Sequence, residues 1–191
     1  MDILTVLILL ALFIYIINVI PFLMPPTWTI LAFFYINYHP PFIPVIVLGA
    51  GAATLGRITL YYLSKRYFRR FFSQKSLKNY DVLGKFVTKN EKFSIPIFIT
   101  YAFFPISSNY VYIAAGLAKI NIKILASSFF VGRLISYSFW VAASHYAVSR
   151  VEDIFTSHIN NIGVIAVELI GFIIVILIGK INWGKILKIP A

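Results

Sequence analysis

Seven apolar segments make up most of this chain, and their lengths limit what it can fold into. They run over residues 3–20, 27–36, 45–63, 93–104, 109–118, 124–149 and 161–179. With 60% hydrophobic and only 12% charged residues, the chain has more apolar surface than a soluble core of 191 residues could hide. The sequence therefore predicts an all-α integral membrane protein that forms a single membrane domain, residues 1–191.

Three of the segments are too short to cross a bilayer alone. A transmembrane helix needs about 20 residues to cover about 30 Å of hydrocarbon, whereas segments 27–36, 93–104 and 109–118 are shorter. They adjoin the sequences PFLMPPT and FPISSN, where prolines should break a helix. The predicted breaks are Pro21, Pro25, Pro26, Pro105 and Gly116. Residues 3–36 and 93–118 are therefore predicted to be re-entrant hairpins, which enter and leave the membrane on one side.

The basic residues indicate the orientation of the chain. If both hairpins turn back while segments 45–63, 124–149 and 161–179 cross, 14 of the 17 lysines and arginines share one side. By the positive-inside rule that side is cytoplasmic, and it includes the 64–92 loop and the C-terminus. The chain is thus expected to be a multi-pass protein of the cell membrane. The side of the N-terminus stays open, because residues 3–36 could also span once with a kink.

An arginine occurs twice in the same pattern within apolar sequence. LGRITLYYL (residues 55–63) and VGRLISYSF (131–139) share Gly-Arg and a tyrosine four residues later. Each copy follows a broken hairpin, and the two units enter from opposite sides, which indicates an inverted repeat, although three matched positions can also arise by chance. The predicted parts are a first hairpin-plus-helix unit (1–64), a cytoplasmic basic interfacial segment (65–92), a second hairpin-plus-helix unit (93–149) and a C-terminal transmembrane helix (161–179).

These residues resemble the DedA superfamily, also called VTT-domain or SNARE-associated membrane proteins. The resemblance covers roughly residues 18–146. The matching residues are Gly56, Tyr61, Lys65, Arg66, Pro105, Ala114, Ala115, Gly116 and Gly132. It implies two facing re-entrant hairpins and a scramblase- or flippase-like function, which moves phospholipids or a polyprenyl-phosphate carrier between leaflets.

The chain departs from this family at its charged positions. Where bacterial members usually carry carboxylates around the first hairpin tip, this chain has Asn18 and Thr27, and the acid usual after the second glycine is Arg57. Family arginines that flank the hairpin proline fall on Ala102 and Ser108. The resemblance therefore implies lipid movement without proton coupling, because the titratable groups are missing.

Arg57 and Arg133 need partners if they lie within the membrane, since an arginine at the bilayer centre costs something like 3 kcal/mol or more. Counted from the cytoplasmic helix ends at 1.5 Å per residue, Arg57 lies about 10 Å deep, Arg133 about 14 Å and Glu168 about 16 Å. Arg57 could extend to the headgroups or face a site. Arg133 is expected to face the interior and pair with Glu168, either as a clasp between helices or as part of a transport path.

The tip after Pro105 could bind an anion. Ser107, Ser108 and Asn109 are good N-cap residues for a half-helix 109–118, whose first N–H groups would point to mid-membrane. A headgroup phosphate could dock there, or the side chains could only cap the helix. The predicted headgroup path consists of Arg57, Arg133, Glu168, Ser107, Ser108, Asn109, Tyr61 and Tyr137.

Other classes of function receive less support. His39, His145 and His158 lack metal-ligand spacing, and GxSxG, HExxH and P-loop motifs are missing. The sequence therefore predicts no enzyme, no metal and no cofactor. Membrane lipids with anionic headgroups are the expected partners, and nucleic acid is not, because topology accounts for the basic residues. A coupled secondary transporter of a small solute and a membrane-organising protein that transports nothing stay open, as does the oligomeric state.

The predicted topology can be tested with single cysteines at Ser73, Asn121 and Asn182, since the chain has no native cysteine. All three should be shielded from a membrane-impermeant thiol reagent in intact cells and react after lysis. Labelling of the Asn121→Cys variant from outside would contradict the second hairpin.

Overall fold

The computed structural model describes residues 2–21, 25–103, 108–146, 170 and 173–187, and this part of the chain contains helices and no strand. The elements are α1 (Ile3–Val19), α2 (Thr27–Tyr38), α3 (Phe42–Arg66), the 3-10 helix η1 (Phe68–Phe71), α4 (Gln74–Lys89), α5 (Glu91–Phe103), α6 (Asn109–Ala118), α7 (Ile122–Tyr146), a helical stretch over 173–180 and α10 (Trp183–Ile186). The predicted all-α class is confirmed. The predicted helix 161–179 lies mostly outside the described residues.

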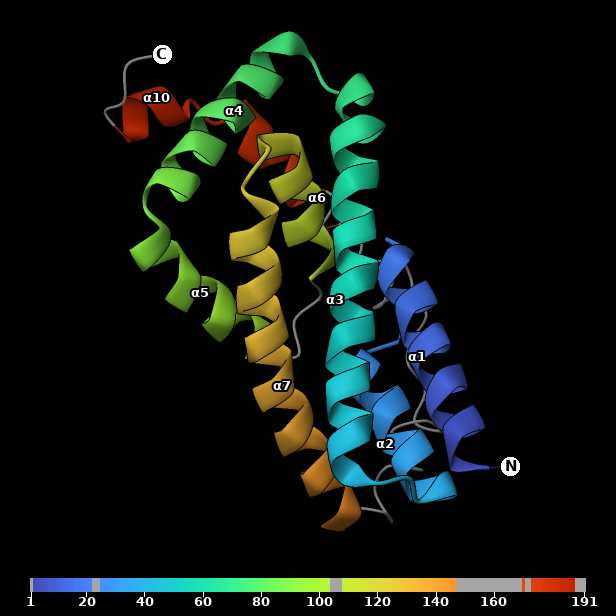
Figure 1. Ribbon diagram of the computed structural model, residues 1–191. Helices are drawn as coiled ribbons and strands as arrows, with labels where there is room; N and C mark the ends of the chain where they lie inside the picture. Colours follow the sequence, from blue (N-terminus) through green and yellow to red (C-terminus); the bar gives the residue numbers. More distant parts are fainter. Residues whose placement is uncertain (1, 22–24, 104–107, 147–169, 171–172, 188–191) are drawn as a thin grey trace.

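Helices α3 and α7 form the long axis of the molecule and run side by side in opposite directions (Figure 1). Both contain stretches long and apolar enough to cross a membrane, Phe42–Arg66 and Ile122–Ala143. Helix α3 begins before the predicted segment 45–63 because Pro44 lies in its first turn, where a missing backbone N–H costs no hydrogen bond. These two helices favour association with a membrane.

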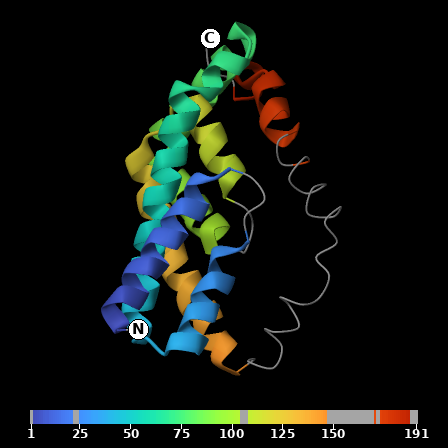
Figure 2. The same cartoon turned by 90° about the vertical axis from the view of Figure 1, so that its right-hand side faces the viewer.

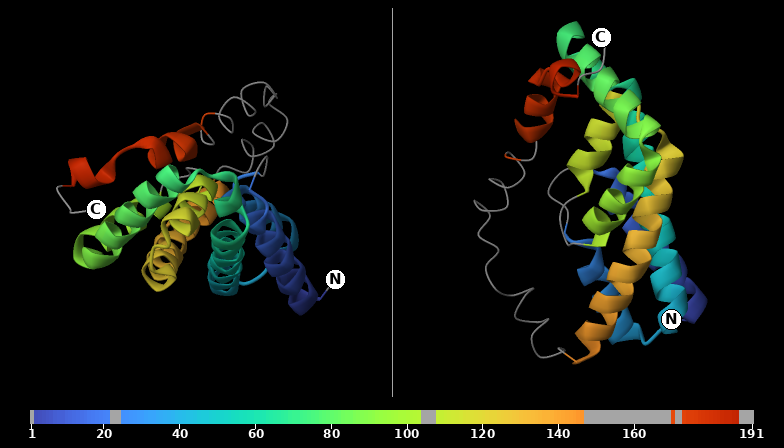
Figure 3. Two further views of the ribbon diagram at one scale, coloured as in Figure 1. Left: turned by 90° about the horizontal axis from the view of Figure 1, so that it is seen from above. Right: turned by 90° about the vertical axis from the view of Figure 1, so that its left-hand side faces the viewer.

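Four shorter helices flank this pair in two layers. Seen from above, α1, α3, α7 and α5 form a row (Figure 3), and the remaining helices α2 and α6 pack against α7 and α3 respectively. The α1–α2 pair covers one half of the long helices and the α5–α6 pair covers the other half (Figure 2). Pro21, which follows the end of α1, and Asn109, the first residue of α6, lie close together, since the Asn109 side chain donates to the backbone oxygen of Pro21 over 2.7 Å.

The first turn follows the proline pattern of the sequence. Helix α1 ends at Val19 and α2 begins at Thr27, with Pro26 at its N-cap position. This agrees with the predicted break at Pro21, Pro25 and Pro26. The second predicted break, Pro105, lies outside the described residues, between α5 and α6.

Two glycines of the repeated pattern are contact points between helices. A Cβ on Gly56 would lie 2.7 Å from both the Tyr15 carbonyl oxygen and Asn18 Cβ of α1. A Cβ on Gly132 would lie 2.8 Å from the Ile99 carbonyl oxygen of α5. Helix α3 therefore approaches α1 at Gly56, and α7 approaches α5 at Gly132. In both cases the glycine directly precedes the arginine of the repeated pattern.

The prediction of Gly116 as a helix break is wrong. Gly116 lies inside α6, and a Cβ there would meet the Tyr61 carbonyl oxygen at 2.6 Å. The same contact region includes a hydrogen bond from Ser64 Oγ to the Ile113 carbonyl oxygen, 2.8 Å long. Gly116 therefore allows α6 to pack closely on α3. A glycine can end a helix, but inside a helix it can also allow close contact with a neighbour.

The outward surface of these helices is strongly apolar. Large apolar side chains that are at least half exposed lie on α1, α3 and α7: Ile3, Leu4, Ile8, Leu12, Ile43, Leu55, Ile135 and Phe139. In soluble proteins, apolar side chains exposed in such number on neighbouring helices often mark a surface that contacts a partner or a membrane. The surface of the described helices is suited to contact with lipid chains.

The basic segment 65–92 folds into η1 and α4 and is tied to the end of α6. Asp81 of α4 contacts Arg69 Nη1 at 3.2 Å and Lys119 Nζ at 3.5 Å. Arg69 also donates to the carbonyl oxygen of Leu117. These contacts hold α4 across the end of the long helix pair.

The glycine contacts predict different effects for two substitutions on α3. Gly56→Ala should lower the free energy of unfolding by about 1–3 kcal/mol, because the new methyl group overlaps α1 backbone. Gly51→Ala is the matched control, since its Cβ would have no neighbour within 4 Å, and alanine there should be neutral or stabilising by up to about 1 kcal/mol. Denaturation in detergent measures both; equal effects would show that Gly56 is not a contact.

Candidate functional site

Arg57 of α3 lies where the end of α1 and the start of α6 come together. It lies on α3 with 7% of its surface exposed. Its Nη1 donates to the backbone oxygen of Asn18, 3.1 Å away at the end of α1, and to Oδ1 of Asn109, the first residue of α6. The side chain of Arg57 therefore points into the helix bundle, and its guanidinium connects three helices.

Asn109 completes the connection between the two turns. Its Nδ2 donates to the backbone oxygen of Pro21 over 2.7 Å, while its Oδ1 accepts from Arg57. Pro21 and Asn109 are 88 residues apart in the sequence. The Asn109 side chain thus supplies a hydrogen bond to a backbone oxygen that has no helical partner, because α1 ends before it.

Asn18 holds the two sides of the first turn together. It is 1% exposed, and its Nδ2 donates to the Ile14 carbonyl oxygen (2.8 Å) and to Thr27 Oγ1 (3.1 Å). These are the two positions where the resemblance expected carboxylates. Here an amide and a hydroxyl replace them, so the site carries no negative charge from the first turn.

Arg133 lies on α7 close enough to Arg57 for the two charges to interact, with Tyr101, Tyr112 and Tyr137 also near Arg57. It is 8% exposed. Its guanidinium carbon lies 5.0 Å from the ring centre of Phe129 and 5.5 Å from that of Tyr137, one helical turn to either side. Such cation–π contacts partly replace the hydration that a buried cation loses.

Neither arginine has a carboxylate partner in the described part of the chain. The ion pairs found there both involve Asp81, at the far end of α3. Glu168, the predicted partner of Arg133, lies outside the described residues. Within those residues the site is a concentration of buried positive charge.

Several buried polar atoms at this site have no hydrogen-bond partner among the described residues. They are Asn18 Oδ1, Arg57 Nε, Ser108 Oγ, Arg133 Nε and Tyr137 Oη. Buried polar groups are normally satisfied, because an unmade hydrogen bond costs about 1–3 kcal/mol. Most of these atoms can donate, so the site is suited to a ligand that accepts hydrogen bonds and carries negative charge.

The structure brings most of the predicted path residues together. Arg57, Arg133, Ser108, Asn109 and Tyr137 belong to one buried site. Tyr61 does not, because its hydroxyl donates to the Ile120 carbonyl oxygen, 2.8 Å away toward the other end of α3. Ser107 lies outside the described residues.

The expected capping of α6 by Ser108 is only partly correct. Ser108 occupies the N-cap position but makes no side-chain capping hydrogen bond, with φ −82° and ψ −4°. A capping residue normally has extended backbone, which aims its oxygen at the helix N–H groups. The Ser108 hydroxyl is buried and unpartnered instead.

Sequence reasoning missed an aromatic contact beside the site. Trp28 of α2 stacks on Trp140 of α7, with ring centres 5.3 Å apart and planes at 28°. Both indole N–H groups are buried without a partner among the described residues. One feature of the sequence could have indicated this contact. Trp140 lies seven residues after Arg133, which places both residues on the same face of α7.

An apolar groove of about 520 Å³ begins beside the first turn. It lies between α1 and α2 and is lined by Leu9, Leu12, Phe13, Ile16, Pro25, Ile30, Phe33 and Phe34. Every lining residue is apolar. The groove is suited to a hydrocarbon chain.

Models of known protein families, curated proteins and solved structures gave no match to this chain. Within the described residues, no three histidine, aspartate or glutamate side chains are grouped to hold a metal ion.

The two hydrogen bonds of Asn109 predict a measurable loss of stability. Asn109→Ala leaves Pro21 oxygen and one Arg57 donor without partners and should cost about 1–3 kcal/mol of unfolding free energy in detergent. Asn37→Ala is the control: its Nδ2 donates to Phe33 oxygen on an exposed helix face, and its loss should cost no more than about 0.5 kcal/mol. Similar losses would contradict the connecting role of Asn109.

Proposed function

We propose that this chain is a membrane lipid transporter, which moves phospholipids or a polyprenyl-phosphate carrier between leaflets. The observation that carries the proposal is the pair of buried arginines, Arg57 and Arg133, without a carboxylate partner among the described residues, where two broken helix pairs meet. A lipid phosphate supplies the missing negative charge and accepts bidentate hydrogen bonds from guanidinium groups. The DedA resemblance points to the same class of substrate.

The packing supports an inverted repeat with re-entrant hairpins. Helix α1 packs on α3 as α5 packs on α7, and α2 packs on α7 as α6 packs on α3. Gly56 and Gly132 make corresponding contacts, and each precedes a buried arginine. In this arrangement both hairpin tips reach the middle of the membrane from opposite sides, as the broken helices of transporters do.

The proposed path for the lipid follows from polarity. The headgroup lies between the hairpin tips, where Arg57, Arg133 and Ser108 have unused polar atoms. A hydrocarbon chain lies in the groove between α1 and α2, which adjoins the same tip through Ile16 and Pro25. The lipid can thus cross the membrane with its headgroup in a polar site and its hydrocarbon chain in apolar surroundings.

Orientation in the membrane is part of the proposal. The 64–92 loop and the C-terminus lie in the cytoplasm, because 14 of the 17 basic residues fall on that side of a multi-pass chain in the cell membrane. The Asp81 contacts and α4 then lie at the cytoplasmic surface, and the α2–α3 turn lies at the outer one.

The proposal is tested with purified protein in liposomes that contain a leaflet-labelled fluorescent phospholipid. The chain should accelerate exchange between leaflets over empty liposomes. Arg57→Gln and Arg133→Gln should each slow it by about tenfold or more, since hydrogen bonds to charged groups contribute about 1.5–3 kcal/mol. Arg66→Gln, an exposed arginine of the same helix, should leave the rate unchanged.

Melting temperatures of all variants show whether a slow variant is still folded. A folded wild-type protein that gives the same exchange rate as empty liposomes, with both phospholipid and polyprenyl phosphate, would overturn the lipid-transport proposal. Uptake of a small solute by the same liposomes would then favour the secondary transporter.

A further inference from the structure

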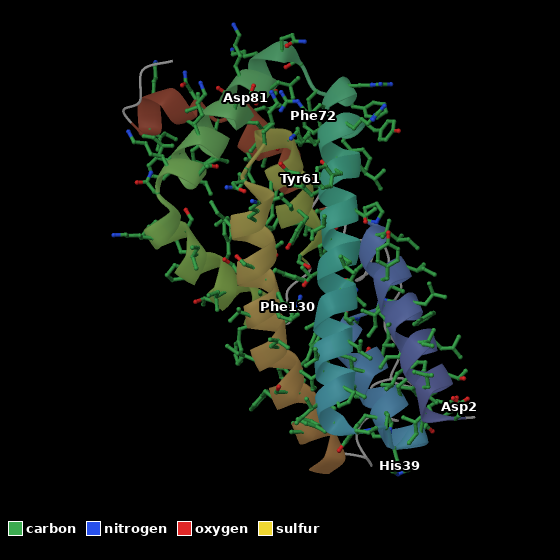
Figure 4. All side chains as sticks on the ribbon, viewed as in Figure 1. Asp2, His39, Tyr61, Phe72, Asp81 and Phe130 are labelled. Carbon is green, nitrogen blue, oxygen red and sulfur yellow. The ribbon has the colours of Figure 1, made fainter. Side chains whose placement is uncertain are left out.

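A second charged site lies far from the arginines, at the end of the molecule where Asp81 is labelled and nitrogen atoms gather (Figure 4). It is a pocket of about 530 Å³ between α4 and the turn from α6 to α7. The lining residues are Asp81, Gly84, Lys85, Thr88, Lys89, Ala118 and Lys119.

The charges in this pocket do not balance. The carboxylate of Asp81 is engaged by Arg69, at 3.2 Å and 3.4 Å, and by Lys119 at 3.5 Å. Lys85 and Lys89 form no ion pair with any described residue. They lie one turn apart on the same face of α4, so two positive charges point toward one pocket without a partner.

The walls of the pocket are held in place by close backbone contact. A Cβ on Gly84 would lie 1.7 Å from the carbonyl oxygen of Ala118, so α4 crosses the end of α6 where no side chain fits. Lys119 follows in the left-handed conformation, with φ 52°. Thr88 Oγ1 accepts from the Asn121 N–H over 3.3 Å, which leaves the hydroxyl hydrogen free to donate to a ligand.

The surroundings of the pocket indicate a lipid surface. Phe71 and Phe93, next to the two ends of α4, are 85% and 68% exposed. Exposed aromatic rings beside lysines are typical of helices that lie at a membrane interface. The pocket would then open at the level of the headgroups.

We propose that this pocket binds a phosphate group carried by an anionic lipid of the adjoining leaflet. Lys85 and Lys89 of α4 and Lys119 of the α6–α7 turn share the phosphate oxygens, with Thr88 as a fourth donor. The bound lipid joins two segments that are distant in sequence and holds α4 against α6. This site is separate from the arginines, and its existence does not require that the chain move lipids.

The test uses the full chain in an uncharged detergent, with melting temperature followed against added short-chain phosphatidic acid. Phosphatidic acid should raise the melting temperature, and phosphatidylcholine of the same chain length should not. In the Lys85→Gln, Lys89→Gln double variant the concentration needed for half the effect should rise about tenfold or more, because two charge-assisted hydrogen bonds to the phosphate are lost. The Lys75→Gln, Lys78→Gln double variant removes the same charge from α4 outside the pocket and should behave like wild type.

Each of the other outcomes decides against the proposal or a part of it. Equal weakening in both double variants would mean diffuse charge attraction, and equal stabilisation by phosphatidylcholine would mean chain binding; either overturns the site. Inorganic phosphate that matches phosphatidic acid at equal concentration would keep the phosphate site and overturn its assignment to lipid. Arg57 and Arg133 are intact in both double variants, so failure here leaves the transport proposal to its own test.

Discussion

The hydrogen bonds of the Arg57 guanidinium are the interaction on which the meeting of α1, α3 and α6 depends. A buried cation in an apolar bundle is costly unless polar atoms surround it. Here the backbone of Asn18 and the amide of Asn109 supply those atoms. Because Asn109 also holds Pro21, one polar network fixes the end of α1 and the start of α6 against α3. The end of one short helix thereby stabilises the start of the other.

This network makes short helices possible in an apolar molecule. A helix that ends inside a bundle leaves N–H and C=O groups that water cannot reach. The first break satisfies some of them through Asn18 and Asn109. Gly56 lets α3 approach α1 closely beside the hydrogen bond from Arg57 to the Asn18 backbone oxygen. What is left unpartnered among the described residues is mostly donor atoms, and that surplus is the basis of the anion binding that we propose.

Arg57, in the interior of α3, and Arg69, beyond its end in η1, meet different kinds of partner. In the middle of the helix, Arg57 has neutral partners and stays without a described counter-charge. Beyond the end of the helix, Arg69 is neutralised by Asp81 and helps to dock α4 on α6. We propose that Arg57 binds an anion, as do the α4 lysines that form no ion pair with a described residue, whereas Arg69 has a structural role.

The sequence by itself determined the helices and pointed to the arginines. Apolar length and prolines predicted α6 at its observed bounds and the break between α1 and α2, because both depend on neighbours in the chain. Only the tertiary structure decided which atoms Arg57 meets, that Gly116 is a packing contact, and that Ser108 leaves its hydroxyl unused. Those outcomes depend on contacts between segments up to 88 residues apart, which no local pattern encodes.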